Sequence, residues 1–314
     1  MSKKHRVVFA GTPDFSVPSL QALLDSEHDV VAVYTQPDRP AGRGRELTPS
    51  PVKRLASSHG IPVCQPEHFK NPETVAALNA WDADVLVVVA YGLLLPQSVL
   101  DTPRFGCINV HASILPRWRG ASPIQQAVLH GDKESGVTIM AMVKAMDAGD
   151  MYHIERYALA PDETTGSLHD RLAKLGPPAL LSVLSSYPDC SSTPQDKTLV
   201  TYAPKITKQD ARLNWQQPAR DLERSVRAYS PWPVAHTAWR DKTIRVHKAS
   251  LLHAESTESE PGVVLGVSDE GIDVQCGKGV LRLLRIQLPG GKAMPVSAWW
   301  NAHRESLSVG DRLM

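Results

Sequence analysis

The chain has 314 residues, of which 42% are hydrophobic and 21% are charged. These are ordinary values for a globular protein, and they exclude disordered, collagenous and coiled-coil chains. Basic and acidic side chains nearly cancel at a net charge of +1, but residues 1–204 carry −3 and residues 205–314 carry +4. The basic second part is compatible with nucleic-acid contact, although a charge of +4 is weak support for it.

Cysteine usage and apolar runs bear on the cellular compartment. The four cysteines form no C-x-x-C pair, which predicts reduced thiols rather than a zinc site or a disulfide framework. The apolar run at 7–10 is too short for a secretory signal, and the interrupted run at 85–95 is too short for a membrane span. We therefore expect a cytoplasmic protein without a membrane anchor.

The first half of the chain alternates short apolar runs with amphipathic segments. Ser50 followed by Pro51 is typical of a helix start, and Gly60 is typical of a helix end. In chain order, the pattern predicts a strand at 6–10, a helix at 15–25, a strand at 30–34, helices at 50–60 and from 71 onward, strands at 84–90 and 106–111, a helix at 123–130 and a strand at 136–142. This alternation indicates an α/β domain with a Rossmann-like, open, mostly parallel sheet and helices on both faces.

The second half of the chain has a different pattern. Residues 185–204 are rich in Ser, Pro, Thr and Asp, which predicts a linker. A helix at 222–228 is followed by short apolar runs at 235–239, 243–248, 262–267, 272–276 and 280–286. About five short strands within 100 residues predict a small OB-like β-barrel. The predicted division is an α/β domain at 1–188, a linker at 189–206 and an OB-like domain at 207–314.

The segment that is richest in candidate catalytic residues lies at the end of the predicted strand at 106–111. Alternate residues of a strand share a face, so the side chains of Asn109 and His111 point the same way. They lie at the carboxyl end of the strand, where open α/β sheets place their ligands. A lone histidine is more often structural, but a polar pair at this end, followed by a loop with Pro and Gly, favours function. Asp147, two residues before Gly149, indicates by itself only a turn.

Taken together, these residues resemble the folate-dependent formyltransferases. The resemblance is carried by Asn109-Val-His111-Ala-Ser113-Ile-Leu-Pro116, with Asp147-Ala-Gly149 some 36 residues later. It is supported by Phe9-Ala-Gly11-Thr-Pro-Asp-Phe15, Thr35-Gln-Pro-Asp-Arg39, Pro116-Arg-Trp-Arg-Gly120, Thr201-Tyr-Ala-Pro-Lys205 and Ser230-Pro-Trp-Pro233. It covers nearly the whole chain, including the second domain, and it is strongest toward the members that act on methionyl-tRNA.

The resemblance implies an activity and three catalytic residues. The expected reaction moves a formyl group from 10-formyltetrahydrofolate to the amine of methionine on initiator methionyl-tRNA, for translation initiation, in a monomer and without a metal. The family's catalytic trio falls on Asn109, His111 and Asp147. Asn109 and a protonated His111 would donate to the tetrahedral oxyanion, while Asp147 would keep His111 cationic and relay the proton of the amine.

The resemblance also implies folate contacts. They fall on the loop residues Ser113, Ile114, Leu115 and Pro116. Tyr91, Gly92 and Leu93, at the end of another central strand, are a candidate wall for the pterin, with plain core packing as an equally good interpretation.

The chain departs from the family pattern close to the expected catalytic carboxylate. Val143, Ala145 and Ala148 stand where the family often has Asp, Gly and Thr, and Ile114 replaces a usual Leu. Because Asp147 itself is kept, these departures bear on the conformation of the loop rather than on the reaction.

Basic residues suggest how the tRNA would be held. Arg39, Arg43 and Arg45 lie among Pro and Gly in the loop at 36–49, which by itself indicates an ordinary solvated basic loop. The family uses this insertion to grip the acceptor end of tRNA, and guanidinium groups suit phosphates and bases. Lys205 and Lys208 are weaker candidates for backbone contact. The resemblance thus makes the first domain catalytic and the second tRNA-binding.

Other functions fit parts of this pattern. Formyltransferases that act on glycinamide ribonucleotide resemble only the first domain, and those that act on sugar nucleotides share the trio but lack the Arg43 loop. A nicotinamide dehydrogenase fits the sheet, but Gly11-Thr-Pro-Asp is no G-x-G-x-x-G motif. A non-catalytic tRNA-binding module would leave the trio unused.

Overall fold

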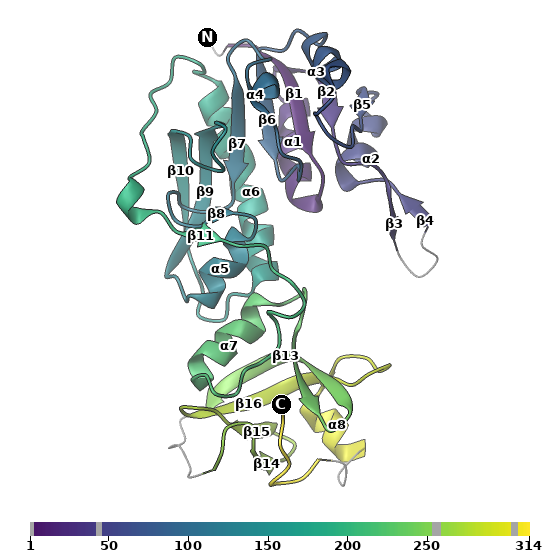
Figure 1. Cartoon of the computed structure of the whole chain (residues 1–314), viewed down its shortest axis with the longest axis vertical. Helices are drawn as coiled ribbons and strands as arrows, with labels where there is room; N and C mark the ends of the chain where they lie inside the picture. The colour runs from purple at the N-terminus through teal and green to yellow at the C-terminus, as the bar shows by residue number, and fades with distance from the viewer. Residues whose placement is uncertain (1–2, 42–45, 253–258, 303–306) are drawn as a thin grey trace. The chain divides into compact units, whose positions relative to one another are not determined.

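The computed structural model describes residues 3–41, 46–252, 259–302 and 307–314 (Figure 1). The chain divides into two compact units. The first consists of residues 1–123, 134–158 and 169–203, and the second of residues 124–133, 159–168 and 204–314.

The first unit is built on a seven-stranded sheet of order β10-β9-β7-β6-β1-β2-β5. Its strands are β1 (Arg6–Gly11), β2 (Asp29–Tyr34), β5 (Val63–Cys64), β6 (Val85–Val89), β7 (Cys107–His111), β9 (Glu134–Ala141) and β10 (Met151–Ala158). Neighbours from β5 to β7 pair in parallel, whereas β9 is antiparallel to both β7 and β10. The mostly parallel, Rossmann-like sheet expected from the sequence is confirmed.

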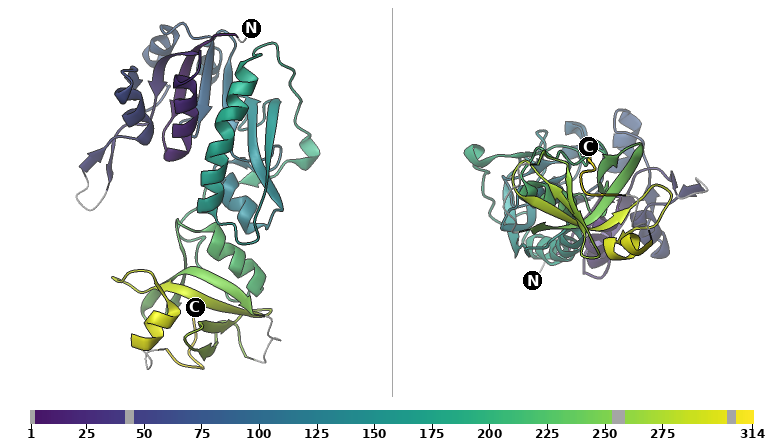
Figure 2. Two further views of the ribbon diagram at one scale, coloured as in Figure 1. Left: turned by 180° about the vertical axis from the view of Figure 1, so that it is seen from behind. Right: turned by 90° about the horizontal axis from the view of Figure 1, so that it is seen from below.

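Helices cover both faces of this sheet. They are η1 (Asp14–Ser16), α1 (Val17–Leu24), α2 (Pro51–Ser58), α3 (Pro72–Asn79), α4 (Gln97–Leu100) and α6 (Thr165–Leu184), of which α6 begins in the second unit. Figure 2 shows α1 and α6 on one face. Gly176 of α6 comes so close to β7 that an added Cβ would lie 3.1 Å from Val110 Cγ1. On the other face, Leu78 of α3 and Val99 of α4 share a buried cluster with Val8 of β1.

Three short pairings complete the first unit. β3 (Arg39–Ala41) and β4 (Glu46–Thr48) form an antiparallel hairpin that projects from the body of the unit in Figure 1. β8 (Arg119–Gly120) pairs in parallel with β11 (Tyr202–Ala203), and Thr193 pairs with Met151 at the start of β10. The segment that the composition predicted as a linker thus packs on the first unit as far as residue 203, with η2 (Lys197–Leu199) within it.

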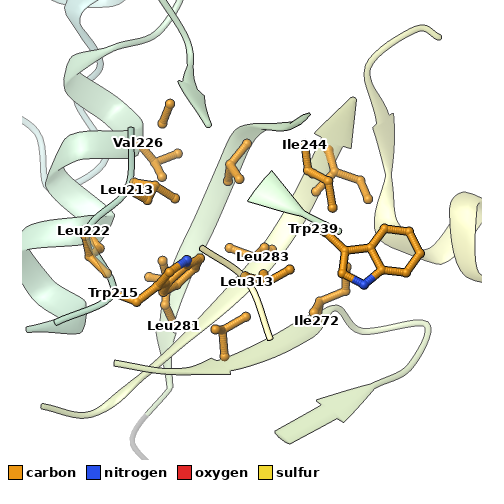
Figure 3. Packing of buried hydrophobic residues seen from close by; sticks show 14 of the residues in the cluster. Leu213, Trp215, Leu222, Val226, Trp239, Ile244, Ile272, Leu281, Leu283 and Leu313 are labelled. Atoms are coloured by element: carbon orange, nitrogen blue, oxygen red, sulfur yellow. The ribbon is translucent and has the colours of Figure 1, made fainter. Parts of the chain in front are cut away.

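The second unit contains the predicted antiparallel, OB-like sheet, of order β12-β13-β16-β15-β14. Its elements are α5 (Pro123–Leu129), which begins at the end of the first unit, α7 (Ala219–Ala228), β12 (Ala235–Trp239), β13 (Lys242–Leu252), β14 (Val264–Val267), β15 (Ile272–Gln275), β16 (Val280–Gln287), β17 (Met294–Pro295) and α8 (Val296–Ala302). Leu222 of α7 belongs to the same buried cluster as Leu281 and Leu283 of β16 (Figure 3). Trp215, in the same core, donates its indole N–H to Thr237 Oγ1 at 2.9 Å.

The longest elements that the sequence pattern did not predict are β10, α6 and α8. The short strands β3, β4, β5, β8, β11 and β17 and the short helices α4 and η2 were not predicted either. Pro177 and Pro178 lie inside α6, where proline normally interrupts a helix, and this hid the helical pattern. The four cysteines are free, as expected. None of the helices in the described ranges is long and apolar enough to cross a membrane.

Candidate active site

The structure brings together the three side chains that the sequence singled out. Asn109 and His111 lie on β7, and Asp147 lies in the loop between β9 and β10. Asp147 Oδ1 is 3.5 Å from Asn109 Nδ2 and 3.8 Å from His111 Nδ1. The side chains of His111 and Asp147 are 6% and 16% exposed, so little water reaches the pair. An amide donor, an imidazole and a carboxylate therefore converge on one point.

The imidazole of His111 has a fixed orientation. Its Nε2 atom lies 3.0 Å from the backbone oxygen of Trp118. Because a carbonyl only accepts hydrogen bonds, Nε2 carries the hydrogen of the neutral ring. Nδ1, which faces Asp147, is consequently the nitrogen that can gain or lose a proton.

The Asp147 loop is held closely by backbone contacts. Asp147 Oδ2 accepts a hydrogen bond from the backbone N–H of Gly120 at 2.8 Å. An added Cβ at Gly149 would lie 1.9 Å from the backbone oxygen of Ala141, so only glycine fits at that position. Asp147 itself has a φ of +50°, in the left-handed region. This conformation is strained for a residue other than glycine, and strain of this kind is concentrated at functional sites.

Gln195 belongs to this site, and the sequence analysis missed it. Its side-chain Nε2 donates to the backbone oxygens of Asp147 and Gly149 at 2.8 and 2.7 Å. Its Oε1 accepts from Arg119 Nε at 2.9 Å. No pattern in the sequence marked it, since it lies in the Ser- and Pro-rich segment that was assigned to a linker.

The loop after His111, where folate contacts were predicted, is held mainly by its own bonds. The hydroxyl of Ser113 donates to the backbone oxygen four residues later, at 2.6 Å. The backbone N–H of Leu115 donates to Thr138 Oγ1 at 3.1 Å, and that hydroxyl donates to the oxygen of Ser113 at 2.7 Å. Ser113 and Leu115 are buried, while Ile114 and Pro116 keep part of their surface exposed. The two half-buried residues are therefore the ones available to a ligand.

The second predicted folate segment combines core and surface residues. The ring of Tyr91 is 2% exposed and packs against Phe69, with ring centroids 6.4 Å apart. Burial raises the pKa of the Tyr91 phenol far above its usual range. Gly92 is exposed, with a φ of +82°, and Leu93 is half-buried. Leu93 packs on the same core cluster as Met142, which precedes the Asp147 loop.

Exposed apolar side chains occur directly after Leu93 and in the loop that carries Asp147. Leu94 is 82% exposed, Met146 is 59% exposed and Val143 is 46% exposed. Of these, Val143 and Met146 belong to the loop that carries Asp147. In the sequence, Leu94 directly follows Leu93 and Met146 directly precedes Asp147, whereas Val143 lies four residues before Asp147.

The predicted tRNA contacts are spread over both units. Arg39 is exposed on β3, and its guanidinium donates to a glutamine side chain three residues earlier at 2.7 Å. Arg43 and Arg45 lie outside the described residues. Lys205 and Lys208 are exposed and belong to the second unit.

Other groups near the site do not fit a catalytic role. Cys107 precedes Asn109 by two residues, but burial raises the pKa of its thiol to about 12, so it is a poor nucleophile at neutral pH. Among the described residues, no three His, Cys, Asp or Glu side chains are grouped so that they could hold a metal ion.

Comparison with known proteins adds to this geometry. Residues 4–184 match the Formyl transferase family, and residues 205–304 match the Formyl transferase C-terminal domain. The chain belongs to the formyl transferase family. Within it, the methionyl-tRNA formyltransferase of Pseudomonas syringae pv. syringae is 51% identical over 99% of this chain and 98% of its own length. That of Hydrogenovibrio crunogenus is 54% identical over 94% of this chain and 95% of its own length.

Solved structures share the formyl transferase fold at low sequence identity. The sugar 3N-formyl transferase WlaRD is 14% identical, with a TM-score of 0.67 over 92% of this chain and 100% of its own. HypX from Aquifex aeolicus in complex with tetrahydrofolic acid is 17% identical, with a TM-score of 0.62 over 99% of this chain. The present chain covers only about half of HypX, 51% of its length. At such identities the likeness establishes the fold alone.

Proposed function

We propose that this protein transfers the formyl group of 10-formyltetrahydrofolate to the α-amino group of methionine on initiator methionyl-tRNA. The observation that carries this proposal is the identity of about half of all residues with relatives named methionyl-tRNA formyltransferase, along nearly the whole chain. The reaction takes place in the cytoplasm, where translation starts, and the protein acts as a monomer.

The reaction needs one bond formed, one bond broken and one proton moved. The neutral amine attacks the formyl carbon, and the carbonyl oxygen becomes an oxyanion in the tetrahedral intermediate. The bond from that carbon to N10 of the folate then breaks. The proton lost by the amine ends on N10, so the two products are the formylated aminoacyl-tRNA and tetrahydrofolate.

Asn109, His111 and Asp147 are the residues to which we assign these tasks. Asn109 Nδ2 and a protonated His111 Nδ1 donate to the oxyanion, as preorganised donors do in other acyl transfers. Asp147 stabilises the imidazolium and accepts the proton of the amine. The support for this assignment is the convergence of the three groups within 3.8 Å, with Nε2 of His111 already committed to a carbonyl.

The folate donor would bind along the exposed apolar side chains beside these three polar residues. We place the pterin between the segment from Gly92 to Leu94 and the segment that leads to Asp147, where exposed apolar side chains are found on both sides. Ile114 and Pro116 supply further apolar contact. Ser113, Leu115 and Tyr91 support this wall from the core. The polar trio would then meet the formyl group on N10.

The tRNA requires cationic contacts away from the reacting atoms. We assign Arg39 of β3, together with Arg43 and Arg45, which lie between β3 and β4 in the sequence, to the acceptor end, and Lys205 and Lys208 to the phosphate backbone. Guanidinium groups both pair with phosphates and stack on bases, which suits an end that has unpaired nucleotides.

The decisive experiment compares acceptors. Purified protein is incubated with labelled 10-formyltetrahydrofolate and with charged initiator tRNA, free methionine or an amino-sugar nucleotide. We expect label on the methionyl-tRNA and almost none on the other two. Formylation of the sugar nucleotide in preference to the tRNA would replace the proposed function by sugar-amine formylation.

A further inference from the structure

All polar groups of the Gln195 side chain form hydrogen bonds. It is 8% exposed, and its carboxamide makes three hydrogen bonds, two as donor and one as acceptor. Both donated bonds go to backbone oxygens of the loop that carries Asp147, at 2.8 Å and 2.7 Å. Only a carboxamide offers two N–H groups and one oxygen in this arrangement.

These bonds close a ring that includes the carboxylate of Asp147. Gln195 joins the backbone of Asp147 to the side chain of Arg119. The next residue, Gly120, donates its backbone N–H to Asp147 Oδ2 at 2.8 Å. The backbone oxygen of Asp147 is therefore linked to Arg119 through Gln195, and its carboxylate is bonded to the adjacent Gly120. These two links fix the position and the orientation of the carboxylate.

Gln195 is itself held from both sides in the chain. Two residues earlier, Thr193 exchanges backbone hydrogen bonds of 2.9 and 2.8 Å with Met151 at the start of β10. Seven residues later, β11 pairs with β8, which contains Arg119. The segment that carries Gln195 is thus anchored to the first unit on both sides of this residue.

The position of Asp147 matters because its distances to Asn109 and His111 are at the long end of the range for direct interaction. Its Oδ1 atom lies 3.5 Å from Asn109 Nδ2 and 3.8 Å from His111 Nδ1. A shift of about 1 Å in a reacting group lowers a rate by up to roughly 100-fold. We propose that Gln195 is a positioning residue for formyl transfer, which acts by holding Asp147 against His111. This inference rests on the proposed function.

The main test is the variant Gln195→Glu. Glutamate keeps the shape of the side chain and the contact with Arg119, but it loses both donated bonds to the Asp147 loop. We expect kcat to fall about 10- to 100-fold, while the KM for the folate donor and the KM for tRNA change little. An unchanged kcat would overturn the proposal.

A double-mutant cycle distinguishes positioning from a general structural effect. If Gln195 acts through the carboxylate of Asp147, the glutamate change has little left to remove in an Asp147→Asn background. We expect a further loss of less than about 3-fold there. Equal losses in both backgrounds would show that Gln195 acts by another route and would refute the proposal.

A measurement that needs no formyl transfer separates this inference from the proposed function. The nitrogen-15 signals of the His111 ring, recorded at one pH without substrates, report the environment of Nδ1. We expect Gln195→Glu and Asp147→Asn to move these signals in the same direction, because both withdraw the carboxylate. Unmoved signals in the Gln195 variant would contradict positioning. Wild-type protein that formylates none of the acceptors would instead refute only the proposed function.

Two further variants complete the set. Asp196→Asn changes the next residue, whose exposed carboxylate accepts hydrogen bonds from the backbone N–H and the hydroxyl of Thr198, and we expect wild-type kcat. Gln195→Met removes all three hydrogen bonds without adding a charge, and it replaces the glutamate variant if that protein does not fold. It should show the same loss of kcat and the same non-additivity with Asp147→Asn.

Discussion

Asp147 illustrates how one side chain can depend on distant parts of the chain. Its carboxylate meets two residues of β7, its side chain is bonded by the backbone of Gly120, and its own backbone is bonded by Gln195. Its left-handed φ of +50° is kept because these contacts over-determine the loop. At the scale of residues, the site is a small polar cluster fixed by backbone hydrogen bonds.

The variant Asp147→Asn tests the role of the charge at this position. Asparagine keeps the shape of the side chain and an oxygen for the Gly120 N–H, but it can neither stabilise an imidazolium nor accept a proton. We expect kcat to fall about 10²- to 10³-fold, the size found when a group that stabilises the transition state is lost. Folate affinity, measured by equilibrium binding, should change little. Near-wild-type turnover would remove Asp147 from the mechanism.

At the scale of elements, the β3–β4 hairpin is an extension with few contacts of its own. Its two described strands are joined by one short ladder, and Leu47 on β4 is 70% exposed. Asp38 precedes the hairpin in the chain and Lys53 follows it, and their ion pair, with nitrogen and oxygen 2.7 Å apart, closes the base of the hairpin. This form suits an element that contacts a large ligand outside the body of the unit.

The hairpin leads to a prediction about tRNA binding. Arg43 lies between β3 and β4 in the chain, and we expect Arg43→Ala to raise the KM for methionyl-tRNA about 10-fold, which corresponds to roughly 1.4 kcal/mol. The KM for the folate donor should stay close to wild type. Lys174→Ala, which removes an exposed cation from α6, is the matched control. Equal changes in both KM values would argue against the hairpin as a tRNA contact.

A second feature at this scale is a pair of stacked histidines beside β1 and β2. The rings of His5 and His28 have centroids 5.4 Å apart, and His28 Nδ1 accepts the backbone N–H of His5 at 3.2 Å. Burial lowers the pKa of His28, the charge of His5 lowers it further, and Glu27 partly opposes both. Folded protein therefore takes up a proton at His28 less readily than unfolded protein does.

The sign of this shift predicts how stability depends on pH. A histidine with a lowered pKa contributes stability above its ordinary value of about 6.5, and this contribution is lost as the pH falls. We expect the melting temperature to drop by a few degrees between pH 7.5 and pH 5, and His28→Gln to reduce the drop. His59→Gln, at an exposed histidine on the end of α2, should leave the pH profile unchanged. An equal dependence of the melting temperature on pH in wild type and in His28→Gln would contradict the assignment of this effect to His28.

At the scale of the whole molecule, the two units do not follow the order of the chain. Residues 124–133 and 159–168 belong to the second unit, and Leu129 of α5 packs on the core of its antiparallel sheet. Residues 189–203 belong to the first unit and supply Gln195 and β11. A cut in the chain at the end of the apparent first domain therefore removes part of the site.

Two fragments test this arrangement. A fragment of residues 1–203 keeps the Gln195 bonds and the β8–β11 pair, whereas a fragment of residues 1–188 lacks both. We expect the shorter fragment to unfold at a lower temperature, followed by circular dichroism, and to be more sensitive to protease near Asp147. Both should be less stable than the full chain, because Leu129 of α5 loses the antiparallel sheet against which it packs. Equal melting temperatures would mean that residues 189–203 contribute nothing to the first unit.

The sequence by itself determined the sheet, the OB-like barrel and the polar trio. Buried strands and turn residues leave local periodic signals, so β1, β6 and β7 and the five strands β12 to β16 were predictable. Asn109 and His111 could be placed on one face because side chains alternate along a strand. Asp147 looked like a turn residue, and only a resemblance to a known family connected it with them.

The tertiary structure alone decided which segments complete the site. Gln195 lies 48 residues from Asp147 in a stretch whose composition suggests a linker, and its side chain bonds to two backbone oxygens that no side-chain pattern encodes. Likewise, the tandem prolines concealed α6, which is stable because packing on the sheet outweighs local propensity. Local patterns specify elements, whereas hydrogen bonds between distant backbones specify how the loops between them are held.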